Sequence, residues 1–177
     1  MKKSLCLVAT LAFLAILLIS PTSSYAAPAN PIELKFSMWN SMQHTTVVEV
    51  FSPFAKELEQ RTQGRVKITF YPGETLGKAR DHYDMAVRGI SDISVFIHGY
   101  TAGRFPLAGV IELPIGVPSG KIGSRVLWEL YEKYMKQEYS GVKILMISAS
   151  EPGQVHTTKK TVKALADLKG MRLRSSG

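Results

Sequence analysis

The spacing of apolar and polar residues divides the chain into alternating strand-like and helix-like segments. Residues 33–39 (ELKFSMW) alternate apolar with polar side chains, which predicts a strand. Residues 45–60 repeat their apolar positions at helical spacing, and Gly64 is expected to cap the helix that they form. Residues 65–72 (RVKITFYP) return to a strand-like pattern. The first segments therefore predict a strand-helix-strand unit.

A second unit of the same kind follows. The pattern predicts a helix over residues 78–89 and a short strand over residues 92–97 (DISVFI). Two consecutive strand-helix-strand units favour a parallel sheet whose crossovers are helical. The fold class that we predict is therefore α/β.

The second half of the chain begins with a long loop rich in Gly and Pro, residues 98–120, of the kind that is often functional. Helical spacing then predicts a helix over residues 119–139. Residues 142–150 (VKILMISAS) are almost continuously apolar, which is typical of a strand buried on both faces.

The character of the chain changes near residues 148–152. The segment beyond it is polar and extended, with a turn of helix expected over residues 164–170 and a strand over residues 171–175 (MRLRS). We therefore predict one α/β unit over residues 27–150 and the start of a second unit over residues 151–177.

The first 26 residues have the pattern of a secretory signal peptide. A basic start precedes fifteen apolar or small residues and a small-residue exit, with cleavage expected after Ala26. The apolar run is shorter than the about 20 residues of a membrane-spanning helix. Cys6, the single cysteine, would leave with this peptide. Export without disulfides favours the periplasm of a bacterium.

The formal net charge is +8, and the signal peptide contributes two of the lysines. The remaining charge contains no block of five like charges, which favours a small anionic ligand over nucleic acid.

The sequence lacks the constellations of an enzyme or a metal site. The stretch GETLGKA at Gly73 differs from a phosphate-binding loop in its spacing, and Ala79 stands where such a loop has Ser or Thr. The four histidines are scattered, without the spacing of a zinc site, and we find no GxSxG motif. We therefore expect no metal, no cofactor and no catalysis.

The candidate binding residues follow the predicted strands. In open parallel sheets, ligands bind outside the carboxyl ends of the strands. Trp39 follows the first strand, His98 and Tyr100 follow the third, and Gln154 follows the apolar run. In the last strand, alternation places Arg172 and Arg174 on one face, where a guanidinium is suited to pair with a carboxylate in two hydrogen bonds.

The order of these segments resembles a known family. The stretches YPGETLG, Glu112-Leu113-Pro114 and ADLKGMRLR are similar to those of the extracytoplasmic solute receptors of TRAP transporters, the DctP type of periplasmic binding protein. The resemblance runs from about Leu34 to the end of the chain. It implies a periplasmic-binding-protein-like fold of two α/β lobes that close on an organic acid, which membrane subunits then import.

The resemblance also implies roles for particular residues. The signature arginine of the family falls on Arg174, which would clamp the carboxylate of the ligand, and Arg172 matches a variable position. Sialic-acid-binding relatives carry an arginine and a glutamate where this chain has Gln154 and Ile97, so a sialic acid receptor is not expected. Gln154 would hydrogen-bond a smaller acid, and Trp39, His98 and Tyr100 would shape the pocket.

Members of this family are longer than the present chain. We therefore expect a fragment, with a truncated gene as the alternative, in which the first lobe is largely present and the second is truncated after its start at residue 151. Three other hypotheses stay open: a receptor of an ATP-driven (ABC) importer, a periplasmic hydrolase, and a basic adhesive surface protein.

Overall fold

The computed structural model describes residues 30–158 and 160–174 of the chain. The predicted signal peptide, residues 1–26, its cleavage site at Ala26 and Cys6 lie outside the described residues. Within those two ranges, no helix has both the length and the apolar character needed to cross a membrane.

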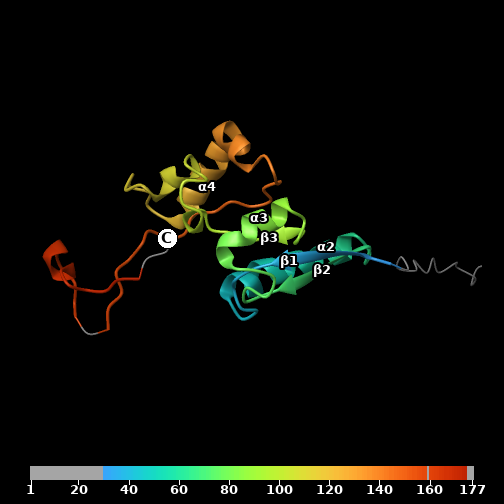
Figure 1. Cartoon of the computed structure of the whole chain (residues 1–177), viewed down its shortest axis with the longest axis horizontal. Coiled ribbons are helices and arrows are strands. Elements are labelled where there is room, and N and C mark those ends of the chain that lie inside the picture. The colour runs from blue at the N-terminus through green and yellow to red at the C-terminus, as the bar shows by residue number, and fades with distance from the viewer. Residues whose placement is uncertain (1–29, 159, 175–177) are drawn as a thin grey trace, which may run out of the picture.

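Three parallel strands form a sheet, which lies below and to the right of α4 in Figure 1. β1 (Ile32–Ser37) lies between β2 (Val66–Tyr71) and β3 (Ile93–Ser94), so that the strand order is β2-β1-β3. The register pairs Phe36 of β1 with Phe70 on one side and with Ile93 on the other. The predicted parallel sheet and the α/β class are confirmed.

The first crossover helix is α2 (Ser52–Arg61), which connects β1 to β2. It continues from a π-helical turn, η1 (Val47–Phe51), and Pro53 near the junction has no N–H to donate to a regular α-helical bond. Gly64 adopts a φ of 76° and donates its N–H to the carbonyl oxygen of Glu59 at 2.8 Å. The expected glycine cap is therefore confirmed.

The second crossover is shorter than the helix predicted over residues 78–89. It begins as a 3-10 turn, η2 (Ala79–Asp81), and continues as α3 (His82–Val87). Gly89 then takes a φ of 69°, a conformation that ends helices and that glycine adopts without strain.

Two clusters of apolar side chains form the core. The first cluster lies between the sheet and η1 and consists of Phe36, Met38, Val47 and Phe51. The second cluster joins α3, the long loop and the helical segment that follows it, and it is mainly aromatic: Tyr83, Phe105, Ala108, Leu127, Met135, Tyr139 and Ile147.

A long helical segment follows the loop. α4 (Gly120–Leu130) continues as a π-helical turn, η5 (Tyr131–Met135), and a 3-10 turn, η6 (Lys136–Tyr139). The Ser119 hydroxyl accepts the N–H of Ile122 at 3.4 Å and caps the start of the helix. The helix predicted over residues 119–139 is therefore confirmed.

The long loop rich in Gly and Pro carries two short 3-10 turns, η3 (His98–Tyr100) and η4 (Ala108–Glu112). The Glu138 carboxylate accepts the backbone N–H groups of Leu107 at 2.6 Å and Ala108 at 3.2 Å. These bonds attach the start of η4 to η6 and give the loop a defined path.

The strand predicted over residues 142–150 was wrong, because this segment packs along α4 and pairs with no strand. The N–H of Ala149 donates to the Ser124 hydroxyl of α4 at 3.0 Å. A Cβ at Gly120 would lie 3.0 Å from the Ala149 carbonyl oxygen, so the missing side chain permits this close approach. β3 contains only two residues, which leaves little sheet edge for a further strand.

The side chains of the same segment also differ from the expectation of burial on both faces. Ile147 is buried, whereas Leu145 and Met146 are 58% and 54% exposed. The apolar run is therefore half-covered, by α4 and the aromatic cluster on one side.

The last described residues, 151–158 and 160–174, extend away from the body as a loop of chain (Figure 1, orange to red). The helical turn predicted over residues 164–170 is confirmed as η7 (Leu165–Leu168). The Asp167 carboxylate accepts the N–H groups of Lys163 at 2.9 Å and Ala164 at 3.0 Å, and these hydrogen bonds lower the pKa of Asp167.

The strand predicted over residues 171–175 was wrong for its described part. Residues 171–174 have no regular secondary structure and pair with no strand of the described sheet. Ser175 lies outside the described residues. Alternation alone does not make a strand, since its backbone N–H and C=O groups need a partner.

Candidate functional site

The strand order places the candidate site at the carboxyl ends of β1 and β3. The chain moves in one direction from β1 to β2 and in the opposite direction from β2 to β3. Right-handed crossovers then place α2 and α3 on opposite faces of the sheet, and the order reverses between β1 and β3. In open α/β sheets this switch point is where ligands bind.

Trp39 and Tyr100 meet at this switch point. Trp39 follows the end of β1, and Tyr100 belongs to η3, which follows β3. Their ring centroids are 6.0 Å apart with the ring planes at 70°, and both side chains are half-buried. The structure thus brings together two of the five predicted binding residues, as an edge-to-face aromatic pair.

The loop after β2 (YPGETLG) borders the same end of the sheet. The Glu74 carboxylate accepts the N–H of Ala79 at 2.7 Å and contacts the ammonium of Lys78 at 3.3 Å, and these contacts lower the pKa of Glu74. The N–H of Gly73 donates to the Asn40 carbonyl oxygen at 3.1 Å. The carboxylate therefore occupies the start of η2, and the loop is linked to the residue after Trp39.

His98 lies among the aromatic side chains of the second core cluster. Its Nε2 is 2.6 Å from the Tyr139 hydroxyl oxygen, and its ring centroid is 5.3 Å from that of Phe105. Burial lowers the pKa of His98, against the opposing effects of Glu112 and Glu138. The structure therefore places this predicted binding residue in packing contacts, and its role in ligand binding stays a prediction.

Lowering the pH from 7 to 5 should reduce the free energy of unfolding through His98. The unfolded chain binds the proton near the ordinary pKa of 6.5, and the folded chain binds it only at lower pH, so stability is lost as the pH falls through that window. His98→Gln keeps a nitrogen near Tyr139 without titrating, and it should flatten this slope. Urea unfolding of both proteins at the two pH values measures the effect, and an equal slope in the variant would contradict it.

His82 is a residue that sequence reasoning missed. It is fully buried at the first position of α3, and its ring centroid lies 6.1 Å from that of Trp39. Nδ1 is 2.9 Å from the carbonyl oxygen of Val95, and Nε2 is 3.2 Å from that of Gly77. No local motif marks the residue, because its partners lie on two other segments.

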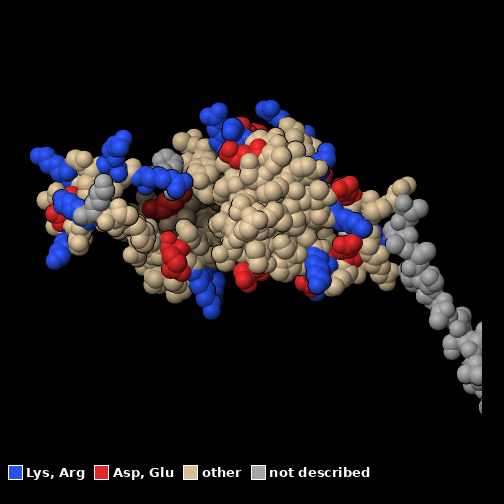
Figure 2. Space-filling view, turned by 90° about the horizontal axis from the view of Figure 1, so that it is seen from below, with Lys and Arg blue, Asp and Glu red and all other residues tan. Residues whose placement is uncertain are grey.

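Gln154 and Arg174 are exposed on the segment that extends from the body. Cationic side chains gather on this segment, at the left of Figure 2. The described ones are all exposed, and they are Lys160, Lys163, Lys169, Arg172 and Arg174. Glu151 and Asp167 are the acidic residues within it. The segment is thus the more basic part of the described chain, and it carries both charged and amide groups suited to an anion.

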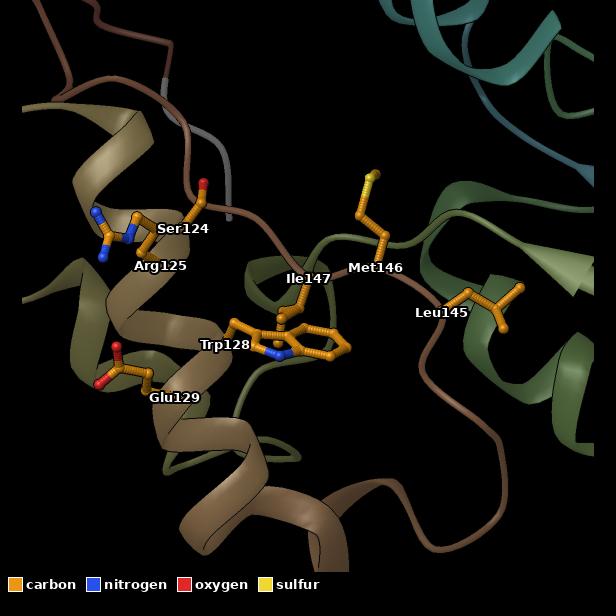
Figure 3. Close-up of a pocket in the computed structure, with 7 residues that line it drawn as sticks. All are labelled: Ser124, Arg125, Trp128, Glu129, Leu145, Met146 and Ile147. Atoms are coloured by element: carbon orange, nitrogen blue, oxygen red, sulfur yellow. The ribbon is translucent and has the colours of Figure 1, made fainter. Parts of the chain in front are cut away.

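An open hollow of about 380 Å³ lies between α4 and residues 145–147. In Figure 3 the Trp128 indole extends from α4 toward Ile147, whereas Arg125 and Glu129 extend to the other side of the helix. Leu145 and Met146 complete an apolar lining. Ser124, Arg125 and Glu129 of α4 are also among its lining residues, and none of the predicted binding residues lines it.

Metal-binding chemistry has no cluster to support it in residues 30–158 and 160–174. No three His, Cys, Asp or Glu side chains of these ranges gather as metal ligands. The three hydroxyl groups of Ser37, Ser91 and Ser94 do approach one another, at 2.6 to 3.2 Å. They satisfy one another's hydrogen bonds between β1 and β3, as buried polar groups require.

Comparison with known proteins agrees with the architecture. The family model described as "Bacterial extracellular solute-binding protein, family 7" matches residues 36–177. A TRAP solute-binding protein from Rhodoferax ferrireducens, solved with copurified benzoate, is 33% identical with a TM-score of 0.74. That comparison covers 78% of this chain and 44% of the solved one.

Two further relatives have the same description as binding proteins. A TRAP periplasmic solute-binding protein from Bordetella bronchiseptica, solved with (R)- and (S)-mandelate, is 33% identical over 79% of this chain and 45% of its own, with a TM-score of 0.71. The 2,3-diketo-L-gulonate-binding periplasmic protein of Escherichia coli is 27% identical over 93% of this chain and 49% of its own length. The chain therefore spans about half the length of these relatives.

Proposed function

This chain belongs to family 7 of the bacterial extracellular solute-binding proteins, and from that premise we propose that it forms part of a periplasmic receptor for a small aromatic carboxylate. The receptor delivers the acid to the membrane subunits of a TRAP-type transporter. Its relatives are solute-binding receptors and not enzymes, so the activity is capture and release without catalysis.

The Trp39–Tyr100 pair is the observation that carries this proposal. The two half-buried rings lie at the switch point of the sheet with their centroids 6.0 Å apart. Aromatic side chains offer a large, rigid apolar surface, and a flat aromatic ring of a ligand packs well against such an edge-to-face pair. The Trp39–Tyr100 pair therefore favours a ligand with a ring over a small, fully polar acid.

The carboxylate of the ligand is held by Arg174, with Gln154 as a neutral hydrogen-bond donor beside it. Arg174 falls at the signature position of the family, and the exposed cations of residues 160–174 attract an anion toward it. A guanidinium binds a carboxylate in two parallel hydrogen bonds, which fixes the orientation of the ligand as well as its charge. In the closed receptor the Trp39–Tyr100 pair contacts the ring of the ligand, and Arg174 binds the carboxylate at its other end.

The ligands of two solved relatives support an aromatic acid, whereas the less similar Escherichia coli relative is named for an aliphatic one. The solved relatives from Rhodoferax ferrireducens and Bordetella bronchiseptica contain benzoate and mandelate, which both join a carboxylate to a benzene ring. Both are 33% identical to this chain.

A thermal-shift screen tests the proposed ligand class. The protein should carry this sequence at the full length of its relatives, and the screen should compare benzoate, 3-hydroxybenzoate and mandelate with succinate and gluconate. We expect the aromatic acids to raise the melting temperature and the others to have little effect. Equal shifts from the aliphatic acids, or a shift from them alone, would contradict the aromatic class.

A further inference from the structure

His82 is a buried side chain that contacts Trp39 of the Trp39–Tyr100 pair and two backbone segments next to it. It is 0% exposed, although histidine is polar on two edges, so its ring nitrogens must find partners inside the protein. Both partners are backbone carbonyl oxygens: Nδ1 faces that of Val95 at 2.9 Å, and Nε2 faces that of Gly77 at 3.2 Å. One imidazole therefore spans two separate backbone segments.

Those two segments border the proposed site from different sides. Val95 directly follows β3, and its N–H donates to the carbonyl oxygen of Ser37 at 3.1 Å, which continues the hydrogen-bonding pattern of the sheet. Gly77 ends the loop after β2. A Cβ at Gly77 would lie 2.6 Å from the sulfur of Met85, so the loop passes close against the Met85 side chain of α3. His82 thus joins the end of β3, the β2 loop and the start of α3.

Trp39 depends on this junction for the direction of its side chain. The backbone on both sides of it is already fixed, since the N–H of Met38 donates to Tyr71 at 3.1 Å and the carbonyl of Asn40 accepts from Gly73 at 3.1 Å. Among the aromatic contacts of the described residues, the indole ring pairs with His82, at a centroid distance of 6.1 Å, and with Tyr100, at 6.0 Å. The backbone hydrogen bonds fix the position of the Trp39 main chain, and the two rings fix the orientation of its side chain.

We propose that His82 is a positioning residue for ligand binding: its ring is held between the carbonyl oxygens of Gly77 and Val95, one of which accepts the single N–H of the neutral imidazole, and it fixes the indole in the Trp39–Tyr100 pair. It touches no ligand. The inference rests on the proposed function, because Trp39 matters to binding only if the pair is a wall of the site.

The first experiment needs no ligand and follows the indole directly. The sequence contains two tryptophans, so Trp128→Phe leaves Trp39 as the sole emitter. In that background, His82→Leu removes both ring nitrogens, and with them the N–H that donates to Val95 or Gly77. We expect the emission of Trp39 to shift to longer wavelength and its quenching by acrylamide to increase. His156→Leu, at an exposed histidine, is the matched control and should change neither. Unchanged emission in a folded His82→Leu protein would overturn the proposal.

Two conservative variants separate positioning from general damage to the fold. The amide nitrogen of Asn takes the place of Nδ1 and can donate to the carbonyl oxygen of Val95, whereas that of Gln takes the place of Nε2 and can donate to that of Gly77. Each should recover part of the wild-type emission, even if His82→Leu does not fold. Emission equal to that of unfolded protein in both, with circular dichroism showing a native fold, would contradict the bridging role.

The second experiment measures affinity at the full length of the relatives, with benzoate as the probe. A neutral imidazole donates through one ring nitrogen, so whichever of His82→Asn and His82→Gln loses that donor should weaken binding by about tenfold, which is the effect expected from losing one neutral hydrogen bond. If the wild-type protein binds benzoate and both variants bind it with the same affinity, the positioning role is refuted and the proposed function stands. If the wild-type protein binds none of the aromatic acids while the fluorescence results hold, the proposed function fails. The contacts of His82 with Gly77, Val95 and Trp39 then serve the structure alone.

Discussion

Replacing Arg174 by alanine should abolish measurable binding of an aromatic carboxylate. The guanidinium is the group proposed to pair with the carboxylate, and its loss from a closed site leaves the anion without a partner. Truncating one member of such a pair costs about 2 to 5 kcal/mol, or about 30-fold to several thousand-fold in Kd. Calorimetric titration of benzoate into a protein that carries this sequence at the full length of its relatives measures the change.

Arg172→Ala is the matched control for this variant. Arg172 is two residues away, also exposed and also cationic, so it reports the effect of losing one positive charge from the same segment. We expect the Kd of the Arg172→Ala protein for benzoate to stay within a factor of about two of the wild-type value, as for a solvated surface cation. Arg174→Lys should fall between, because an ammonium keeps the charge and loses the paired geometry. Equal losses from both alanine variants would show that only general charge matters.

Replacing Tyr139 by alanine should cost about 3 to 5 kcal/mol of the free energy of unfolding, as large aromatic deletions in cores do. The residue is 1% exposed, and its ring stacks on Phe105 with centroids 5.1 Å apart and planes at 17°. Its hydroxyl contacts Nε2 of His98 at 2.6 Å. Urea unfolding of residues 27–177, followed by circular dichroism, measures the loss.

Two further tyrosine variants separate packing from the hydroxyl. Tyr139→Phe keeps the ring and leaves His98 without its partner, which should cost about 1 to 3 kcal/mol. Tyr134 lies on the same helical segment and is 67% exposed, so Tyr134→Ala should stay within about 0.5 kcal/mol of the wild type. A Tyr139→Ala protein as stable as Tyr134→Ala would show that the aromatic cluster does not hold the loop and the helix together.

The elements that could be predicted from the sequence are those whose signal is local. The alternation in residues 33–39 and 65–72 corresponds to β1 and β2, which exchange hydrogen bonds along their whole length. Gly64 ends its helix through its own positive φ. In these cases the conformation depends on the residues themselves and on one immediate neighbour.

The run over residues 142–150 shows where such reasoning fails. A continuous apolar stretch fits a buried strand or any other segment that covers a core, and periodicity does not separate them. Its conformation is decided by distant groups: the short edge of β3, the glycines of α4 and the Ser124 hydroxyl that bonds Ala149. A strand needs a partner, and the partner is not encoded in the run.

The candidate site divides in the same way. Trp39 and Tyr100 could be chosen because residues after parallel strands gather at one edge of a sheet, and the structure places their rings together. His98 satisfied the same rule, yet its ring turns to Tyr139, a residue 41 positions away. His82 carried no signal, since its significance arises from two carbonyl groups on other segments.

The central claim is that the receptor recognises a ring and a carboxylate in one small molecule. Isothermal titration of the full-length protein with benzoate and with benzamide, which keeps the ring and lacks the charge, tests it most directly. We expect saturable one-to-one binding of benzoate and no detectable binding of benzamide. Equal affinity for the two, or no binding of benzoate, 3-hydroxybenzoate or mandelate, would contradict the account.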